Sequence, residues 1–254
     1  MNGTTTLQNA ICCRDDIMVY LIKMGVPSNP AFKIMETVRK GKALKDPVKW
    51  AENVELMKQN NVEDWYIKSC EKIKYMFPKA HAAAYVTNAF RIAWFKVHHP
   101  KAYYTAFFSI RASDDFDSEI MIFGKEKVKN KMREIDSLGD KATQKDKVQY
   151  PVLELVLEMY ERGLKFLPID LYKSHETNFI AEEYGIRPPL NSIPGLGTVA
   201  AIGIAEARKE GEFSSMEDVR IRSKVGASVI ELLKKFGCLK GMSESNQLSL
   251  FDNM

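Results

Sequence analysis

The chain has 254 residues, of which 45% are hydrophobic and 28% are charged. This composition is ordinary for a globular protein and excludes a wholly disordered chain, a collagen-like repeat and a disulfide-dense mini-protein. No uninterrupted apolar run reaches the ~18 residues that a membrane span needs, and residues 1–9 lack the pattern of an export signal. We therefore expect a cytoplasmic protein with reduced cysteines and no membrane partner.

Charge is divided unevenly along the chain, although the net charge is only +4. Residues 1–112 hold 17 basic and 9 acidic residues, whereas residues 113–254 hold 20 and 24. The first part is basic and the second is slightly acidic. This asymmetry predicts an anionic partner for the first part and, on charge alone, none for the second.

Helical periodicity dominates the first part of the chain. Apolar residues recur at helical spacing and predict helices at about residues 30–40, 47–57, 66–77, 80–97 and 101–110. In the first of these, Asn29 is expected to be the N-cap and Pro30 the first helical residue.

A run of polar turn residues at 112–115 interrupts this pattern and predicts a domain boundary. Two more helices are expected beyond it, at about 117–137 and 144–161. Pro151 lies inside the second of them and is expected to kink it or to shift its start.

The composition changes again between residues 164 and 189. Residues 166–172 and 178–180 are rich in β-formers and predict two short strands. Helical signals resume after Gly197 and near Gly226, and the Ser- and Asn-rich residues 241–254 predict a flexible tail. The predicted fold is mainly α: a helical region, then a small α+β domain, then the tail.

A glycine-rich turn at residues 192–198 has the form of a helix-hairpin-helix. Its glycines permit a tight turn and a close backbone approach to a ligand, and the following helix begins with unpaired N–H groups. A DNA phosphate can bind there without any base being read. A plain turn between two packed helices is the alternative. Candidate DNA-binding residues are Ile193, Gly195, Leu196, Gly197, Thr198 and Arg208.

A second candidate site lies at the start of the helix at 80–97. Lys79 and His81 stand there after a proline, and Tyr85 follows one turn later on the same face. Cations beside free helical N–H groups favour an anion such as a triphosphate. Arg14 is a further candidate for phosphate contact. The alternative is a small-residue packing face with a satisfied histidine.

Asp15 and Asp16 are adjacent, so their side chains point apart on a helix, and one of them is better explained as an N-cap than as a metal ligand. We expect no metal site in this chain.

The last apolar residues of the chain form a short peptide on a polar tail. Exposed leucine and phenylalanine beside a glutamine suit a preformed apolar pocket on a partner protein, unless they fold back on their own domain. The residues concerned are Gln247, Leu248, Ser249, Leu250 and Phe251.

Five stretches together resemble the C-terminal end of the PolC-type DNA polymerase III alpha subunit of low-GC Gram-positive bacteria. The stretches are CRDDIMVYL at 13–21, FPKAHAAAY at 77–85, FKVHHP at 95–100, IPGLG at 193–197 and QLSLF at 247–251. They occur in the family's order, and the resemblance covers essentially the whole chain. One departure is that Asp252, Asn253 and Met254 follow the last motif, where the family often ends near the phenylalanine.

The resemblance implies a piece of a replicative polymerase, which adds deoxynucleotides to a primer 3′ end. It implies distal fingers at 1–112, a duplex-DNA-binding domain at 113–243 with its helix-hairpin-helix at about 190–210, and a tail at 244–254 that binds the sliding clamp through 247–251. The partners implied are primer–template duplex, incoming deoxynucleotide triphosphate, the sliding clamp and the remainder of the polymerase.

The resemblance also assigns roles to the candidate residues. Arg14, Lys79, His81 and Tyr85 would face the incoming nucleotide. No catalytic residue is expected here, because the palm aspartates that hold two Mg²⁺ ions lie outside this segment. The chain alone is therefore expected to be inactive. A separately expressed, non-enzymatic DNA- and clamp-binding subunit is the alternative, and a repair accessory protein with a helix-hairpin-helix is a weaker one.

Overall fold

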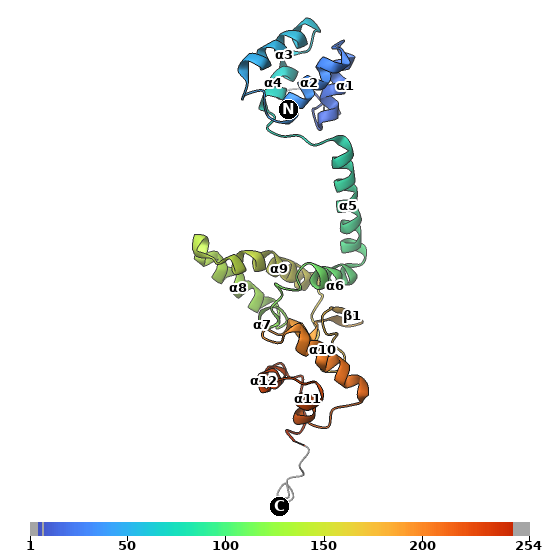
Figure 1. Ribbon diagram of the computed structural model, residues 1–254, viewed down its shortest axis with the longest axis vertical. Coiled ribbons are helices and arrows are strands. Elements are labelled where there is room, and N and C mark those ends of the chain that lie inside the picture. The colour runs from blue at the N-terminus through green and yellow to red at the C-terminus, as the bar shows by residue number, and fades with distance from the viewer. Residues whose placement is uncertain (1–4, 7, 246–254) are drawn as a thin grey trace, which may run out of the picture. The chain divides into compact units, whose positions relative to one another are not determined.

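The chain divides into two compact units, Met1–Ile92 and Ala93–Met254. The computed structural model describes residues 5–6 and 8–245, and both units are mainly helical (Figure 1). The division falls inside a continuous helix rather than at the polar residues 112–115. The physical reason is that the helix before residue 112 buries Tyr104 and Phe108 in the core of the second unit.

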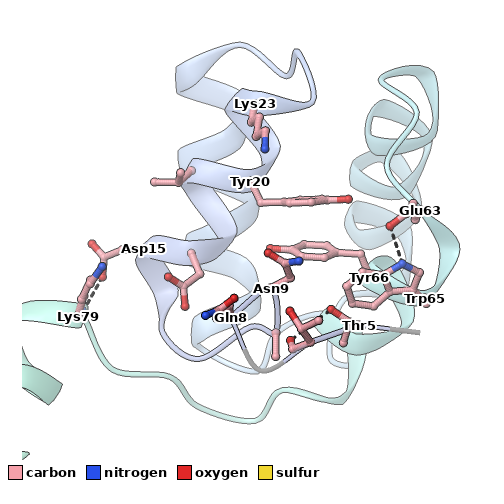
Figure 2. Close-up of a pocket in the computed structure, with 14 residues that line it drawn as sticks. Thr5, Gln8, Asn9, Asp15, Tyr20, Lys23, Glu63, Trp65, Tyr66 and Lys79 are labelled. Atoms are coloured by element: carbon pink, nitrogen blue, oxygen red, sulfur yellow. Dashed lines mark hydrogen bonds between the residues drawn. The ribbon is translucent and has the colours of Figure 1, made fainter. Parts of the chain in front are cut away.

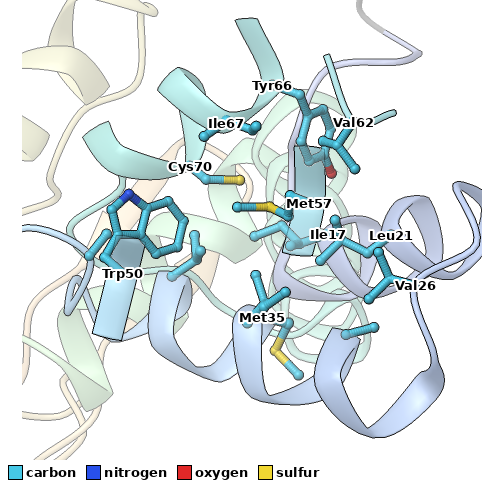
Figure 3. Close-up of a cluster of buried hydrophobic side chains, with 14 residues drawn as sticks. Ile17, Leu21, Val26, Met35, Trp50, Met57, Val62, Tyr66, Ile67 and Cys70 are labelled. Carbon is cyan, nitrogen blue, oxygen red and sulfur yellow. The ribbon is translucent and has the colours of Figure 1, made fainter. Parts of the chain in front are cut away.

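The first unit is built from short helices joined by tight turns (Figure 1). They are α1 (Arg14–Lys23), α2 (Ser28–Arg39), α3 (Pro47–Gln59), α4 (Asp64–Lys72) and the first part of α5 (Lys79–His98). Ile17, Leu21, Met57 and Tyr66 are completely or almost completely buried, and with Ile34 they hold α1 to α4 together (Figure 3). Apolar residues at helical spacing thus build the core that their periodicity predicts.

Local capping chemistry explains the start of α3 but not that of α2. Asp46 caps α3 as its side chain accepts a hydrogen bond from the Lys49 N–H at 3.2 Å. The prediction that Asn29 caps α2 is wrong, because the helix starts at Ser28 and Pro27 is the N-cap. The Ala31 N–H bonds to the Pro27 carbonyl, which draws the buried Ala31 into the helix's first turn.

The second unit continues with the end of α5 and a set of further helices. They are α6 (Pro100–Ile110), α7 (Ser118–Met121), α8 (Lys125–Leu138), a 3₁₀ turn η1 (Gly139–Lys141) and α9 (Gln144–Glu161). α9 begins at a capping box in which Thr143 and Asp146 exchange hydrogen bonds, and it runs on through the exposed Pro151. The predicted helix at 117–137 is two helices: α7 ends at Met121 with Ile122 as its C-cap, and Gly124, with a φ of +102°, is the N-cap of α8.

The strands of the second unit are shorter and lie later than predicted. β1 (Ile180–Glu182) and β2 (Gly185–Arg187) form an antiparallel hairpin. Residues 166–172 form no strand beyond one isolated bridge from Phe166 to Ile186. Phe166 instead enters an aromatic cluster with Phe108, Phe116 and Phe179, whose ring centroids lie 4.8 to 6.2 Å apart.

The remaining elements surround a separate buried core. They are the 3₁₀ turn η2 (Leu190–Ser192), α10 (Thr198–Ala207), the 3₁₀ turn η3 (Arg208–Glu210), α11 (Met216–Arg222) and α12 (Ala227–Lys235). Its members include Leu190, Ile193, Leu196, Ile204 and Leu233.

The last described residues are fastened to this group of helices. The N–H groups of Met216 and Glu217, at the start of α11, donate to the carbonyls of Ser243 and Glu244 at 2.9 and 3.1 Å. The Glu244 carboxylate also pairs with Lys234 of α12 at 3.1 Å. These contacts hold residues 243 and 244 against α11 and α12.

Candidate nucleic-acid interface

The glycine-rich turn before α10 is held in place by two buried apolar side chains. Ile193 and Leu196 are only 1% and 2% exposed, and they pack in the same core as α10 and α12. Between them Gly195 adopts a φ of +89°, a conformation that favours glycine. Ile193 and Leu196 therefore support the hairpin from beneath, and any contact they make with DNA is through their backbone.

Above these anchors the hairpin presents unpaired backbone donors. Gly197 is the N-cap of α10 and supplies no side-chain cap. Within the described residues, no hydrogen-bond acceptor is present for the N–H groups of Gly195, Gly197, Thr198, Val199 and Ala200. Such a cluster at a helix N-terminus has the chemistry of a phosphate site.

The hairpin is also sterically open. A side chain built on Gly197 would meet no atom within 4 Å. Val199, two residues later, is 85% exposed. An extended polyanion can therefore approach the backbone of this hairpin, which the buried side chains of Ile193 and Leu196 anchor to the core.

A second hairpin of the same shape joins α11 to α12, and the sequence did not reveal it. Lys224 has a φ of +54°, the buried Val225 follows, and Gly226 caps α12 with φ −76° and ψ 164°. Gly197 has nearly the same angles, −69° and 159°. The N–H groups of Gly226, Ala227 and Ser228 likewise have no acceptor within residues 8–245.

The two hairpins are brought together at one glycine. Gly203 lies in the middle of α10, and a side chain there would stand 2.6 Å from the backbone carbonyl oxygen of Ser223. That distance is shorter than any normal carbon–oxygen contact. Gly203 therefore allows α10 to lie directly against the turn that precedes α12.

The basic residues around the hairpins are partly committed to the fold. Nη1 of Arg208 donates to the carbonyls of Leu171 and Ser174 at 2.8 and 2.7 Å, so this candidate DNA ligand already fixes a neighbouring loop. Arg222 pairs with Asp218 and lies 4.5 Å from the ring of Phe213. Arg222 is therefore a structural residue.

In the first unit, two motifs separated by more than 60 residues meet. The N–H of Arg14 donates to the Phe77 carbonyl at 3.1 Å, and the N–H of Lys79 donates to the Asp15 carboxylate at 2.7 Å. Nη1 of Arg14 lies 3.7 Å from Glu36. Arg14 and Lys79 therefore stand on neighbouring elements, although Asp15 already occupies one of the donors that begin α5.

Aromatic rings continue along α5 from this junction. Phe77 stacks on His81 with centroids 4.7 Å apart and planes 11° apart, and His81 lies 4.3 Å from Tyr85. Tyr85 is 68% exposed. The predicted pair, His81 and Tyr85, thus forms one face with Phe77, which the sequence reading had not singled out as a binding residue.

A pocket of about 610 Å³ opens beside Lys79 (Figure 2). Its walls include Asp15, Tyr20, Lys23 and Tyr66, and the rings of the two tyrosines stack 3.9 Å apart. Arg14, His81 and Tyr85 are not among the residues that line it. The four candidate nucleotide ligands are therefore close in the fold but do not share this one pocket.

The acids of the first motif act as helix caps. The Asp16 carboxylate accepts from the N–H groups of Cys12 and Cys13 at 3.0 and 2.9 Å. Burial opposes its ionisation, but these hydrogen bonds outweigh burial and hold the pKa of Asp16 below its usual value. Within the described residues no cluster of three or more His, Cys, Asp or Glu side chains is placed to hold a metal ion. The donor set here does not fit a magnesium site.

The proposed clamp-binding residues 247–251 lie outside the described residues. Among the residues described, no helix combines the length and apolarity needed to cross a bilayer.

Known proteins resemble this chain in its second unit and over nearly its whole length. A family model described as a helix-hairpin-helix motif matches residues 163–248, which include both hairpins. Proteins named DNA polymerase III PolC-type match 98% of the chain. The one from Clostridium perfringens is 55% identical over 249 residues, and the one from Bacillus subtilis is 54% identical over 250.

A third such protein, from Caldanaerobacter subterraneus subsp. tengcongensis, is 52% identical over 249 residues. In each case the chain spans only 17% of the relative's length. The match is nearly complete for this chain and small for the relatives, as for a fragment of a much longer protein. Over almost its whole length, the chain is therefore similar to one segment of proteins named DNA polymerase III PolC-type.

Proposed function

We propose that this segment holds primer–template duplex for a replicative polymerase through the two hairpins of its second unit. The observation that carries the proposal is the cluster of unpaired N–H groups at Gly195 and at residues 197–200, next to the buried side chains of Ile193 and Leu196. Backbone donors bind phosphates of any sequence, which a replicative enzyme requires because it must move along every template.

The second hairpin supports the same function. A helix N-terminus with free donors at Gly226 and a positively charged Lys224 can contact a second phosphate of the duplex. Two backbone sites held in a fixed relation by Gly203 would grip a strand at two points.

We propose that the first unit supplies the face of the fingers that meets the incoming deoxynucleotide triphosphate. Lys79 and Arg14 would neutralise phosphate charge, and the N–H groups of Ala80 and His81, which have no acceptor in the described part of the chain, would donate to it. The exposed ring of Tyr85 suits a sugar or base. The rest of the polymerase would supply the palm carboxylates and their Mg²⁺ ions.

We propose that residues 247–251 tether the polymerase to the sliding clamp. A peptide tether raises the local concentration of the enzyme at the primer end, and so increases the number of nucleotides added per encounter. The anchoring of Ser243 and Glu244 to α11 supports a firm attachment for such a tether.

The experiment that tests the duplex site is a salt titration of duplex binding by the chain, before and after Gly197→Val. Gly197 is the right position because its backbone angles suit any residue and a side chain there meets nothing within 4 Å. Valine should leave the fold intact and obstruct the phosphate, lowering affinity several-fold. Unchanged affinity, with an unchanged circular dichroism spectrum, would contradict the proposal. Gly195→Val is less informative because its φ of +89° makes any side chain strained.

A further inference from the structure

A pocket of about 490 Å³ lies beside the first hairpin and has three walls. One wall is the hairpin from Asn191 to Thr198, the second is the loop at 113–117, and the third is the first turns of α9. The walls are joined to one another: the buried Gln149 side chain of α9 donates to the Asp115 carbonyl at 3.3 Å. The pocket is therefore a fixed part of the fold.

The charges on the walls of this pocket are segregated. Lys145 is the one cation among its lining residues and stands on α9, whereas Asp114, Asp115 and Asp117 all stand on the loop. Asp117 accepts a hydrogen bond from the Glu119 N–H and caps α7. The pocket thus has one positive wall and one negative wall, and the hairpin with its unpaired donors forms the remaining wall.

Lys145 makes one weak contribution to the fold, because its charge helps to hold the pKa of the neighbouring Asp146 below its usual value. The side chain is exposed and has no ion pair within residues 8–245. It lies in the first turn of α9, where the helix dipole disfavours a cation. Lys131, by contrast, pairs with Asp146 at 3.8 Å and Glu134 at 2.8 Å. Because Lys145 is exposed, has no ion pair among the described residues and lies at the unfavourable end of the helix dipole, its charge is available to an anionic ligand.

We propose that Lys145 completes the phosphate site of the first hairpin, and that Asp114 and Asp115 repel the strand from the opposite side of the pocket. This inference rests on the proposed duplex binding and adds its direction. A phosphate on the free N–H groups of Gly197 and Thr198 would lie between a cation and a row of carboxylates. The neighbouring phosphates of the same strand would then follow the side of α9.

The test is a salt titration of binding to a fluorescein-labelled duplex by the full chain and its variants. Lys145→Gln should lower affinity several-fold and reduce the slope of log K against log salt by about 0.9, the loss of one phosphate contact. Lys147→Gln is the matched control, because Lys147 is also exposed, lies one residue beyond Asp146 and does not line the pocket. Its slope should stay unchanged.

A third variant tests the other wall. Asp114→Asn with Asp115→Asn should raise affinity, since it removes repulsion and leaves the backbone carbonyl of Asp115 in place. Equal effects of Lys145→Gln and Lys147→Gln, or weaker binding by the asparagine variant, would overturn the inference. Gly197→Val distinguishes the duplex-binding proposal from the role proposed for Lys145. If Gly197→Val weakens binding while Lys145→Gln does not, duplex binding stands and only the role of Lys145 fails. If neither weakens it, the duplex site itself is wrong.

Discussion

The side-chain hydroxyl of Ser118 donates a hydrogen bond to that of Ser192 at 2.7 Å, and both side chains are buried. Ser192 in turn donates to the Pro189 carbonyl at 2.6 Å. The chain of bonds joins α7 to the segment that leads into the first hairpin. The two hydroxyls are unequal, because only Ser192 has a partner on each side.

This inequality predicts an order of stabilities. Ser192→Ala leaves the buried Ser118 hydroxyl without its acceptor and should cost about 1–3 kcal/mol of unfolding free energy. Ser118→Ala leaves the Ser192–Pro189 bond in place and should cost about 0.5–1.5 kcal/mol. Urea denaturation of the two variants measures both values, and a larger cost for Ser118→Ala would show that the chain of bonds is misassigned.

Gly203→Ala should destabilise the protein, although alanine is the better helix former. Helix propensity alone would favour alanine by about 1 kcal/mol. The new Cβ would meet the Ser223 carbonyl at 2.6 Å and force α10 away from the second hairpin. Because overpacking of this kind costs about 1–3 kcal/mol, the net change should be a loss. Thermal denaturation gives the sign, and a higher melting temperature would argue against the close contact.

The stability of the first unit should fall in acid through Glu36. Hydrogen bonds from Arg39 and Lys40 lower the pKa of Glu36 from 4.5 to about 2. A carboxylate whose pKa is lower in the folded than in the unfolded protein stabilises the fold fully at a pH above its unfolded-state pKa. This contribution should therefore disappear as the pH falls from about 4.5 to about 2. Fluorescence of Trp50 and Trp65 during urea denaturation reports on this unit.

Glu36→Gln should therefore flatten the pH dependence of stability in that range. Glu52→Gln is the control, since Glu52 is exposed and has no ion pair in the described part of the chain. A pH profile that is the same for both variants would show that the Arg39–Glu36–Lys40 group contributes nothing measurable.

Deletion of residues 247–251 should abolish binding to the sliding clamp and leave duplex affinity unchanged, because the hairpins and the tail motif are separate parts of the chain. Surface plasmon resonance with immobilised clamp measures the first effect and the salt titration the second. Retained clamp affinity after the deletion would refute the tether.

The purified chain should not extend a primer when supplied with Mg²⁺ and deoxynucleotides. Its paired acids are engaged in capping: Asp16 binds the N–H groups before α1, and Asp15 binds the N–H of Lys79. Neither is free to join a two-metal site. A gel-based extension assay checks this, and any templated product would contradict the expectation that the catalytic carboxylates lie outside this segment.

Local signals in the sequence were enough to predict most of the helices. Asp46 before Pro47 marks the start of α3, and the capping pair Thr143 and Asp146 lies at the predicted start of α9. These features depend on residues three or four apart. The mainly helical fold and the first hairpin were predictable for the same reason.

The features that the sequence did not predict depend on contacts between residues far apart in the chain. Phe166 was read as part of a strand because its neighbours favour β structure, but it is drawn into a ring cluster with Phe108 and Phe116. The Asp15 carboxylate bonds to the N–H of Lys79, 64 residues away, and so takes up a donor expected to be free. The sequence does not indicate the second hairpin, because Lys224 occupies the position with positive φ where glycine is usual.

The attachment of residues 243 and 244 to α11 sets a limit on reach. Phe251 lies six residue steps beyond Ser245 in the sequence, and a fully extended chain covers about 3.3–3.6 Å per residue. Whatever surface receives Phe251 must therefore lie within about 20 Å of Ser245. If Phe251 binds the sliding clamp and the hairpins bind the duplex, as proposed, the clamp would have to lie close to α11, and the two attachments would act at nearly the same place along the DNA.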